Sequence, residues 1–127
     1  MNESASKLVI DLAQLFLEQL PHIASDWTRA FFRFIATDDH YGSNASYVTP
    51  QDVMLVSAMK YGGFYDRMND LGFQLRRETE NNGRKFCVFL LVVDAAFNYE
   101  IKFEYRDIEK WKITKLDGAS GMPAGLQ

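Results

Sequence analysis

The side chains that most often carry chemistry are scarce in this chain and lie apart. There are two histidines, His22 and His40, and one cysteine, Cys87. A metal site needs several His, Cys, Asp or Glu ligands around one point, and the run from Asp38 to His40 is the local candidate. Successive residues rarely point at one ion, so a solvated acidic turn is the favoured interpretation of this run.

Nucleophilic and acid–base catalysis are not indicated either. Cys87 lies in the apolar run from Lys85 to Val93, where a buried, unreactive thiol is the default. The segment Tyr61-Gly62-Gly63-Phe64 lacks the lysine and serine of a phosphate-binding loop. Glu100 and Glu104 would lie about 13 to 14 Å apart along a strand, too far for a general acid and base pair. The sequence therefore predicts a protein that is not an enzyme and that has no cofactor and no metal.

The spacing of apolar residues predicts two helices. Apolar residues recur with helical spacing over residues 4–20, and Pro21 should end that helix because the residue before a proline disfavours the helical region. The same spacing returns over residues 64–81, and Gly83 is suited to the left-handed position after a helix.

Strands are expected on both sides of the second helix. They are predicted over Trp27–Ala36, Ala45–Thr49, Val53–Lys60, Lys85–Val93 and Tyr99–Tyr105. The region 53–60 could instead begin a long helix, although a strand is favoured. In the first strand, alternation puts Arg29 and Arg33 on the more solvated face.

The last two of these strands differ in pattern. The run 85–93 is apolar without alternation, which suits a central strand covered on both faces. The run 99–105 alternates, so its charged residues should form a solvated face. Residues 108–116 would add a last strand or a turn.

These elements predict an α+β fold, a small single-domain sandwich in which an N-terminal helix and a second long helix pack on an antiparallel β-sheet. The 127 residues are typical of one domain. The ordered core is expected over about residues 4–116. Residues 117–127 are rich in Gly, Ala and Pro and are expected to be a frayed tail.

Composition narrows the classes of partner. The net charge of -3 and the pI of about 5.3 argue against direct binding of nucleic acid. No apolar run approaches the ~20 residues of a membrane span, and the N-terminus does not look like a signal peptide. A single cysteine excludes an internal disulfide. A soluble, cytoplasmic protein is expected, with no membrane contact.

Several segments together carry a family resemblance. They are Leu20-Pro21 with Trp27 shortly after, the helix Phe64 to Arg77, Glu80-Asn81-Asn82-Gly83, and the strand from Tyr99 to Asp107. With these residues the chain resembles the YezG-like family of bacterial toxin-immunity proteins, antitoxins of the polymorphic-toxin or contact-dependent growth inhibition type.

The resemblance implies a protein that neutralises a cognate toxin, often a nuclease domain, by stoichiometric binding without turnover. Such an interface would combine an acidic rim that steers a basic nuclease with aromatic anchors. The candidate partner-binding residues are Asp38, Asp39, Tyr41, Glu100, Lys102, Glu104 and Trp111. A monomer or a weak homodimer is expected.

Two alternatives remain open from the sequence. Trp111, between two lysines, is either a core anchor for the C-terminal segment or an exposed contact residue. The whole protein could instead be a small-ligand-binding or adaptor α+β domain, with a pocket between the second helix and the sheet.

Overall fold

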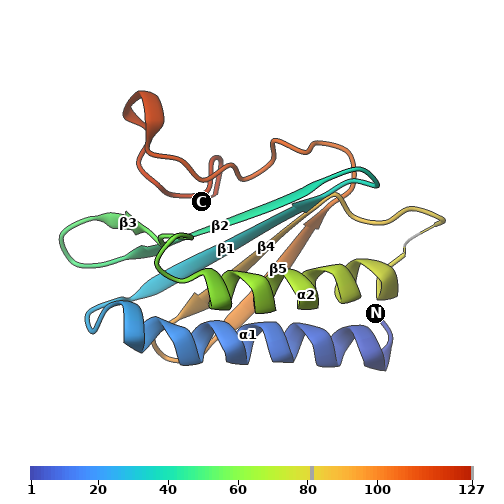
Figure 1. The fold of residues 1–127 in the computed structure, drawn as a ribbon, viewed down its shortest axis with the longest axis horizontal. Helices are drawn as coiled ribbons and strands as arrows, with labels where there is room; N and C mark the ends of the chain where they lie inside the picture. The colour runs from blue at the N-terminus through green and yellow to red at the C-terminus, as the bar shows by residue number, and fades with distance from the viewer. Residues whose placement is uncertain (81, 127) are drawn as a thin grey trace.

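Two helices cover one face of an antiparallel sheet, and the C-terminal segment crosses the other face (Figure 1). The computed structural model describes residues 1–80 and 82–126. The elements are α1 Glu3–Ile23, β1 Arg29–Ala36, β2 Tyr41–Val48, β3 Val53–Leu55, α2 Gly62–Glu78, β4 Val88–Asp94, β5 Tyr99–Glu104 and the short 3₁₀ helix η1 Leu116–Gly118. The strand order is β3-β2-β1-β4-β5. The predicted α+β fold with two helices on an antiparallel sheet is confirmed.

Helix α1 begins and ends slightly outside its predicted limits. The side-chain oxygen of Asn2 accepts the N–H of Ala5 at 2.7 Å and caps the helix. Pro21 lies inside the last turn rather than ending it, and Ala24 N–H still reaches the Leu20 carbonyl at 3.0 Å. A proline near a helix end removes only one donor, so the final turn survives here.

Helix α2 ends at Glu78, before the predicted end at Asn81, which lies outside the described residues. The Thr79 hydroxyl donates to the Leu75 carbonyl at 2.7 Å, so a side chain occupies an acceptor of the last turn. Gly83 does have a left-handed φ of 75°. It lies in the turn that follows, however, and not directly after the helix.

Aromatic rings fill the layer between the helices and the sheet. Phe32 of β1 is fully buried, with ring centroids 6.0 Å from Phe16 on α1 and 5.9 Å from Phe64 on α2. The rings of Phe16 and Phe64 stack at 5.8 Å. Phe89 of β4 closes the cluster at 6.2 Å from Phe32. This cluster joins both helices to the two central strands.

Gly72 lets α2 lie close to β1. A Cβ added there would be 3.0 Å from two ring atoms of Phe34, closer than side chains normally pack. Gly72→Ala is therefore expected to lower the free energy of unfolding by about 1 to 3 kcal/mol through overpacking. Gly63→Ala, where nothing lies within 4 Å, should instead raise it by about 0.5 to 1 kcal/mol. Urea denaturation of both variants measures the difference, and stabilisation by Gly72→Ala would contradict this contact.

The edge strand β3 is much shorter than predicted. The prediction of a strand over residues 53–60 is correct only for Val53–Leu55. The chain then turns inward at Val56, which is buried and whose carbonyl accepts the Tyr65 hydroxyl at 2.8 Å. Strand β2, in contrast, begins at Tyr41 and not at Ala45, because it pairs with β1 along its whole length.

The C-terminal segment 106–126, called the strap below, packs against the sheet. Its Ile113 is buried in a second apolar cluster with Phe31 and Leu90. Met122 and Leu126 pack against the same cluster. The prediction of a frayed tail from residue 117 is therefore wrong for residues 117–126. Its composition suggested disorder, but its few apolar side chains pack on the face of the sheet opposite the two helices (Figure 1).

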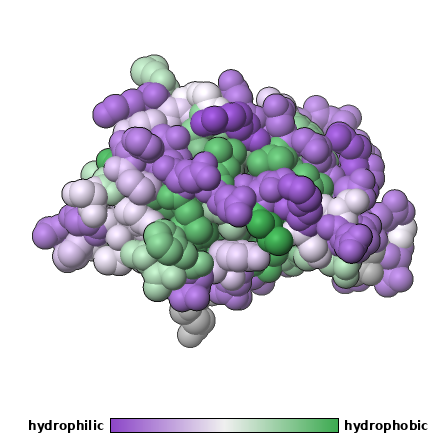
Figure 2. Space-filling model, turned by 90° about the horizontal axis from the view of Figure 1, so that it is seen from below, coloured by the Kyte–Doolittle hydropathy of each residue, from purple (hydrophilic) through white to green (hydrophobic). Residues whose placement is uncertain are grey.

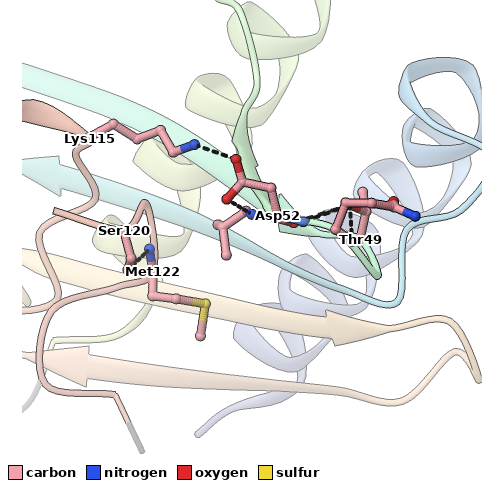
Figure 3. A network of polar contacts seen from close by, with 7 residues as sticks. Thr49, Asp52, Lys115, Ser120 and Met122 are labelled. Atoms are coloured by element: carbon pink, nitrogen blue, oxygen red, sulfur yellow. Dashed lines mark hydrogen bonds and ion pairs between the residues drawn. The ribbon is translucent and has the colours of Figure 1, made fainter. Parts of the chain in front are cut away.

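Backbone and polar contacts hold the strap in place. Gly121 N–H donates to the Thr114 carbonyl at 3.0 Å, within the strap itself. The Lys115 ammonium lies 3.1 Å from Asp52, which also accepts the N–H of Val53 at 2.7 Å (Figure 3). The strap is thereby tied to the turn between β2 and β3. Of the two alternatives for residues 108–116, the described strap contains turns and no strand.

Arg33 is a further anchor and is not solvated as predicted. Its side chain is buried, its Nε donates to the Lys110 carbonyl at 2.8 Å, and its Nη2 donates to the Ile108 carbonyl. Asn44 on β2 donates in the same way to the Ile113 carbonyl at 2.7 Å. Burial lowers the pKa of Arg33, and the neighbouring Glu109 and Asp107 oppose that shift. The strap thus supplies the acceptors that allow a charged side chain to be buried.

Candidate partner-binding surfaces

The structure places the candidate binding residues in two separate groups. The first lies at the turn between β1 and β2 and comprises Asp38, Asp39 and Tyr41. The second lies on the strap side of the sheet and comprises Glu100, Lys102, Glu104 and Trp111. Two strands, β1 and β4, separate β2 from β5, so the sheet does not bring these groups into one site.

The first group stands on a well-ordered turn. Thr37 N–H donates to the His40 carbonyl at 2.9 Å, and the Thr37 hydroxyl accepts the N–H of Asp39 at 3.3 Å. Asp38 is 91% exposed, and its carboxylate lies 3.5 Å from the Arg76 guanidinium on α2. Both aspartates therefore project from a fixed backbone into solvent.

Tyr41 lies beside these carboxylates and is held by another ring. It is 55% exposed, and its ring centroid lies 4.8 Å from that of Phe73 in an edge-on arrangement. Phe73 in turn lies 5.4 Å from the buried Phe34. An exposed aromatic side chain that is already positioned loses little conformational entropy on binding. Asp38, Asp39, His40 and Tyr41 are called the turn surface below.

Basic residues that the sequence reasoning missed lie next to the turn surface. A surface hollow of about 350 Å³ is lined by Asp38, Arg76, Glu80, Gly83, Arg84, Lys85 and Tyr105. Arg84 and Lys85 are exposed. They follow α2 in the chain, so only the fold brings them to the β1–β2 turn. This end of the molecule therefore offers charges of both signs.

The charged face of β5 is less free than its alternation suggested. The carboxylate of Glu104 accepts the N–H groups of Arg106 and Asp107, each at 3.1 Å. These hydrogen bonds lower the pKa of Glu104 and shape the turn from β5 into the strap. Lys102 is half-buried, and Glu100 is the exposed carboxylate of this face.

Trp111 belongs mainly to the packing of the strap. It is half-buried against the second apolar cluster, and its φ of 59° is a left-handed conformation that bulky residues rarely adopt. The Lys110 ammonium lies 5.7 Å from its ring centroid. Of the two alternatives for Trp111, the core anchor describes these contacts better.

Phe97, at the tip of the β4–β5 hairpin, was missed as a surface feature. It is 70% exposed with a φ of 68°, and Tyr99 beside it is 46% exposed. The Asp94 carboxylate supports this turn by accepting the Asn98 side-chain amide at 3.1 Å and the Ala96 N–H at 2.9 Å. These hydrogen bonds lower the pKa of Asp94. The signal in the sequence is a phenylalanine at a position where hairpins usually carry glycine.

Two buried or half-buried titratable side chains, Cys87 and Tyr65, are held in their neutral forms. Burial raises the pKa of the Cys87 thiol, which disfavours the reactive thiolate. Burial also raises the pKa of Tyr65 to about 12. Rings of Phe34, Phe73 and Phe86 lie beside α2, where a small-ligand-binding domain would need its pocket. Within residues 1–80 and 82–126, no group of three or more His, Cys, Asp or Glu side chains is arranged to hold a metal ion.

The side of the molecule that carries α1 has a mixed surface. Apolar side chains gather near its middle within a polar frame (Figure 2). The described helices do not combine the length and hydrophobicity that crossing a bilayer requires. Comparison of the chain with protein-family models and with curated proteins found no match.

Proposed function

We propose that the chain is a cytoplasmic immunity protein that binds a cognate bacterial toxin, with a nuclease as its active domain, and neutralises it by stoichiometric association. The resemblance carried by Leu20-Pro21, Trp27, the α2 segment and the β5 segment supports this proposal. The observation that carries it furthest is the turn surface, where an exposed, positioned tyrosine accompanies two exposed aspartates next to a hollow lined by charges of both signs.

The charges of the turn surface suit a nuclease as partner. A nuclease contacts phosphates through lysine and arginine, so its substrate groove is basic. Asp38 and Asp39 are exposed and would meet such a groove as phosphate mimics. Opposite charges of this kind accelerate encounter and reject wrong partners. Arg84 and Lys85 nearby would add discrimination by pairing with acidic residues on the rim of the toxin.

Tyr41 would supply the affinity of this interface. Tyr41→Ala is expected to weaken toxin binding by about 30-fold or more, since binding hot spots contribute about 2 kcal/mol or more. Its effect on the free energy of unfolding should be small, below about 1 kcal/mol, because the ring is largely exposed. Met59→Ala is the matched control, because Met59 is 98% exposed and lies elsewhere on the surface. Equal affinities for both variants would remove the turn surface from the proposal.

Protection of cells tests the function itself. The gene immediately upstream of this chain should encode the toxin, and its induction alone should stop growth. Co-expression of the chain should restore growth, and co-expression of Tyr41→Ala combined with Asp39→Lys should not. Growth arrest that the intact chain fails to relieve would overturn the proposed function.

A further inference from the structure

Strand β5 forms an open edge of the sheet. It pairs with β4, and among the described residues no strand lies on its other side. The N–H of Asp94 donates to the Asn98 carbonyl at 3.0 Å, and hydrogen-bonded positions alternate along an antiparallel ladder. Residues 100, 102 and 104 therefore direct their backbone groups toward β4. The backbone groups of Tyr99, Ile101 and Phe103 point outward, where another strand could pair with them.

We propose that two copies of the chain associate through antiparallel pairing of their β5 strands, with Ile101 of each copy on the two-fold axis. This register places the outward-pointing positions opposite one another, as continuation of the ladder requires. It also places Glu100 of each copy opposite Lys102 of the second copy. Each contact is made twice, and cross-strand pairs of opposite charge stabilise antiparallel strands.

The charge pattern selects this register over its neighbour. A shift by one pairing step would place Lys102 opposite Lys102 and Glu100 opposite Glu104, so every charged pair would repel. A lysine on an edge strand commonly discourages pairing. Here Lys102 lies opposite Glu100 of the second copy, so the lysine forms an attractive pair. In the shifted register it would meet a second lysine, which disfavours that register.

The exposed aromatic residues of the hairpin meet suitable partners in this arrangement. The same two-fold axis places Tyr99 opposite Phe103 of the second copy, and Phe97 beside its Tyr105. Phe103 and Tyr105 are half-buried and border a surface groove of about 450 Å³, which is also lined by Met1, Asn2, Glu78, Thr79 and Glu80. The rings of Phe97 and Tyr99 would thus enter or cover a groove that the isolated chain leaves open. Pairing would thereby cover the Phe97 ring, which is 70% exposed in the single chain.

Charge reversal tests the proposal on the chain alone, without a toxin. Sedimentation velocity over a dilution series should show a monomer–dimer equilibrium for the unmodified chain. Glu100→Lys and Lys102→Glu should each raise the dimer Kd about tenfold or more, because each places like charges opposite one another twice. The double variant Glu100→Lys/Lys102→Glu should restore the original Kd to within about threefold, because the pairs are re-formed with exchanged signs. Asp66→Lys, an exposed change on α2, should leave the Kd unchanged.

Four results would overturn the proposal. The first is a monomer at all concentrations up to about 200 μM, a range that reaches weak dimers. The second is a dimer that Lys102→Glu does not weaken, and the third is a double variant that is weaker than both single variants. Tighter association of Glu100→Lys would identify the shifted register and also contradict the proposed one. Circular dichroism of each variant separates loss of pairing from loss of folding. Glu100 is exposed and Lys102 is half-buried, and both changes should leave the spectrum unaltered.

Discussion

Phe32→Ala is expected to lower the free energy of unfolding by about 3 to 5 kcal/mol, the largest effect of any single truncation in the helix-side core. The side chain is fully buried and lies within ring contact of Phe16, Phe64 and Phe89. Its removal leaves a cavity at the point where both helices and both central strands meet. Because these neighbours belong to three other elements, α1, α2 and β4, the cavity cannot collapse by a small shift of one of them.

Urea denaturation of dilute protein measures this effect. Phe97→Ala makes the same chemical change at a position that is 70% exposed, and it should cost less than about 1 kcal/mol. Similar losses for both variants would mean that the ring cluster around Phe32 does not govern the stability of the fold.

Arg33→Ala is expected to release the strap from the sheet. It removes both hydrogen bonds from the guanidinium to the Ile108 and Lys110 carbonyls, and hydrogen bonds from charged groups contribute about 1.5 to 3 kcal/mol each. A loss of about 3 kcal/mol in the free energy of unfolding should follow. Amide hydrogen exchange should rise in residues 108–124, while the amides of α1 and α2 remain comparatively protected.

Two further variants separate anchoring from simple packing. Arg33→Met keeps most of the side-chain volume but donates no hydrogen bond, so it should also raise exchange in the strap. Arg29→Ala changes the neighbouring arginine on the same face of β1, which is only half-buried, and should leave the strap protected. Unchanged exchange in the strap of Arg33→Met would show that Arg33 is not its anchor.

Local patterns in the sequence were sufficient for the helices and the hairpin. The alternation of residues 99–105 and the apolar run before it describe β5 and β4 closely, because each strand's two faces are recorded in its own residues. The same holds for α1, whose apolar stripe is local. Its end was misplaced only because one proline within the last turn costs less than assumed.

Non-local contacts account for what the sequence did not reveal. Arg33 alternates with apolar residues and therefore looked solvated, but its acceptors lie more than 70 residues away in the strap. The strap itself has no periodicity, so its packing depends on a sheet face that forms elsewhere in the chain. Similarly, no local pattern relates Arg84 and Lys85 to the β1–β2 turn.

The surroundings of the candidate binding residues also depend on contacts that no local sequence pattern records. Sequence reasoning named Asp38, Asp39 and Tyr41 as candidate binding residues, and in the structure all three are exposed at one turn. It grouped them with Glu104, whose carboxylate instead caps a turn. The structure thereby separates a turn surface, for which we propose toxin binding, from a strand edge, for which we propose self-association.

Titration of toxin activity tests the central claim of immunity most directly. The purified product of the upstream gene is incubated with nucleic acid, and its cleavage rate is measured as the chain is added. Stoichiometric neutralisation predicts a rate that falls in proportion to the added chain and reaches zero near one chain per toxin domain. A cleavage rate that stays unchanged at a molar excess of the chain would contradict the account.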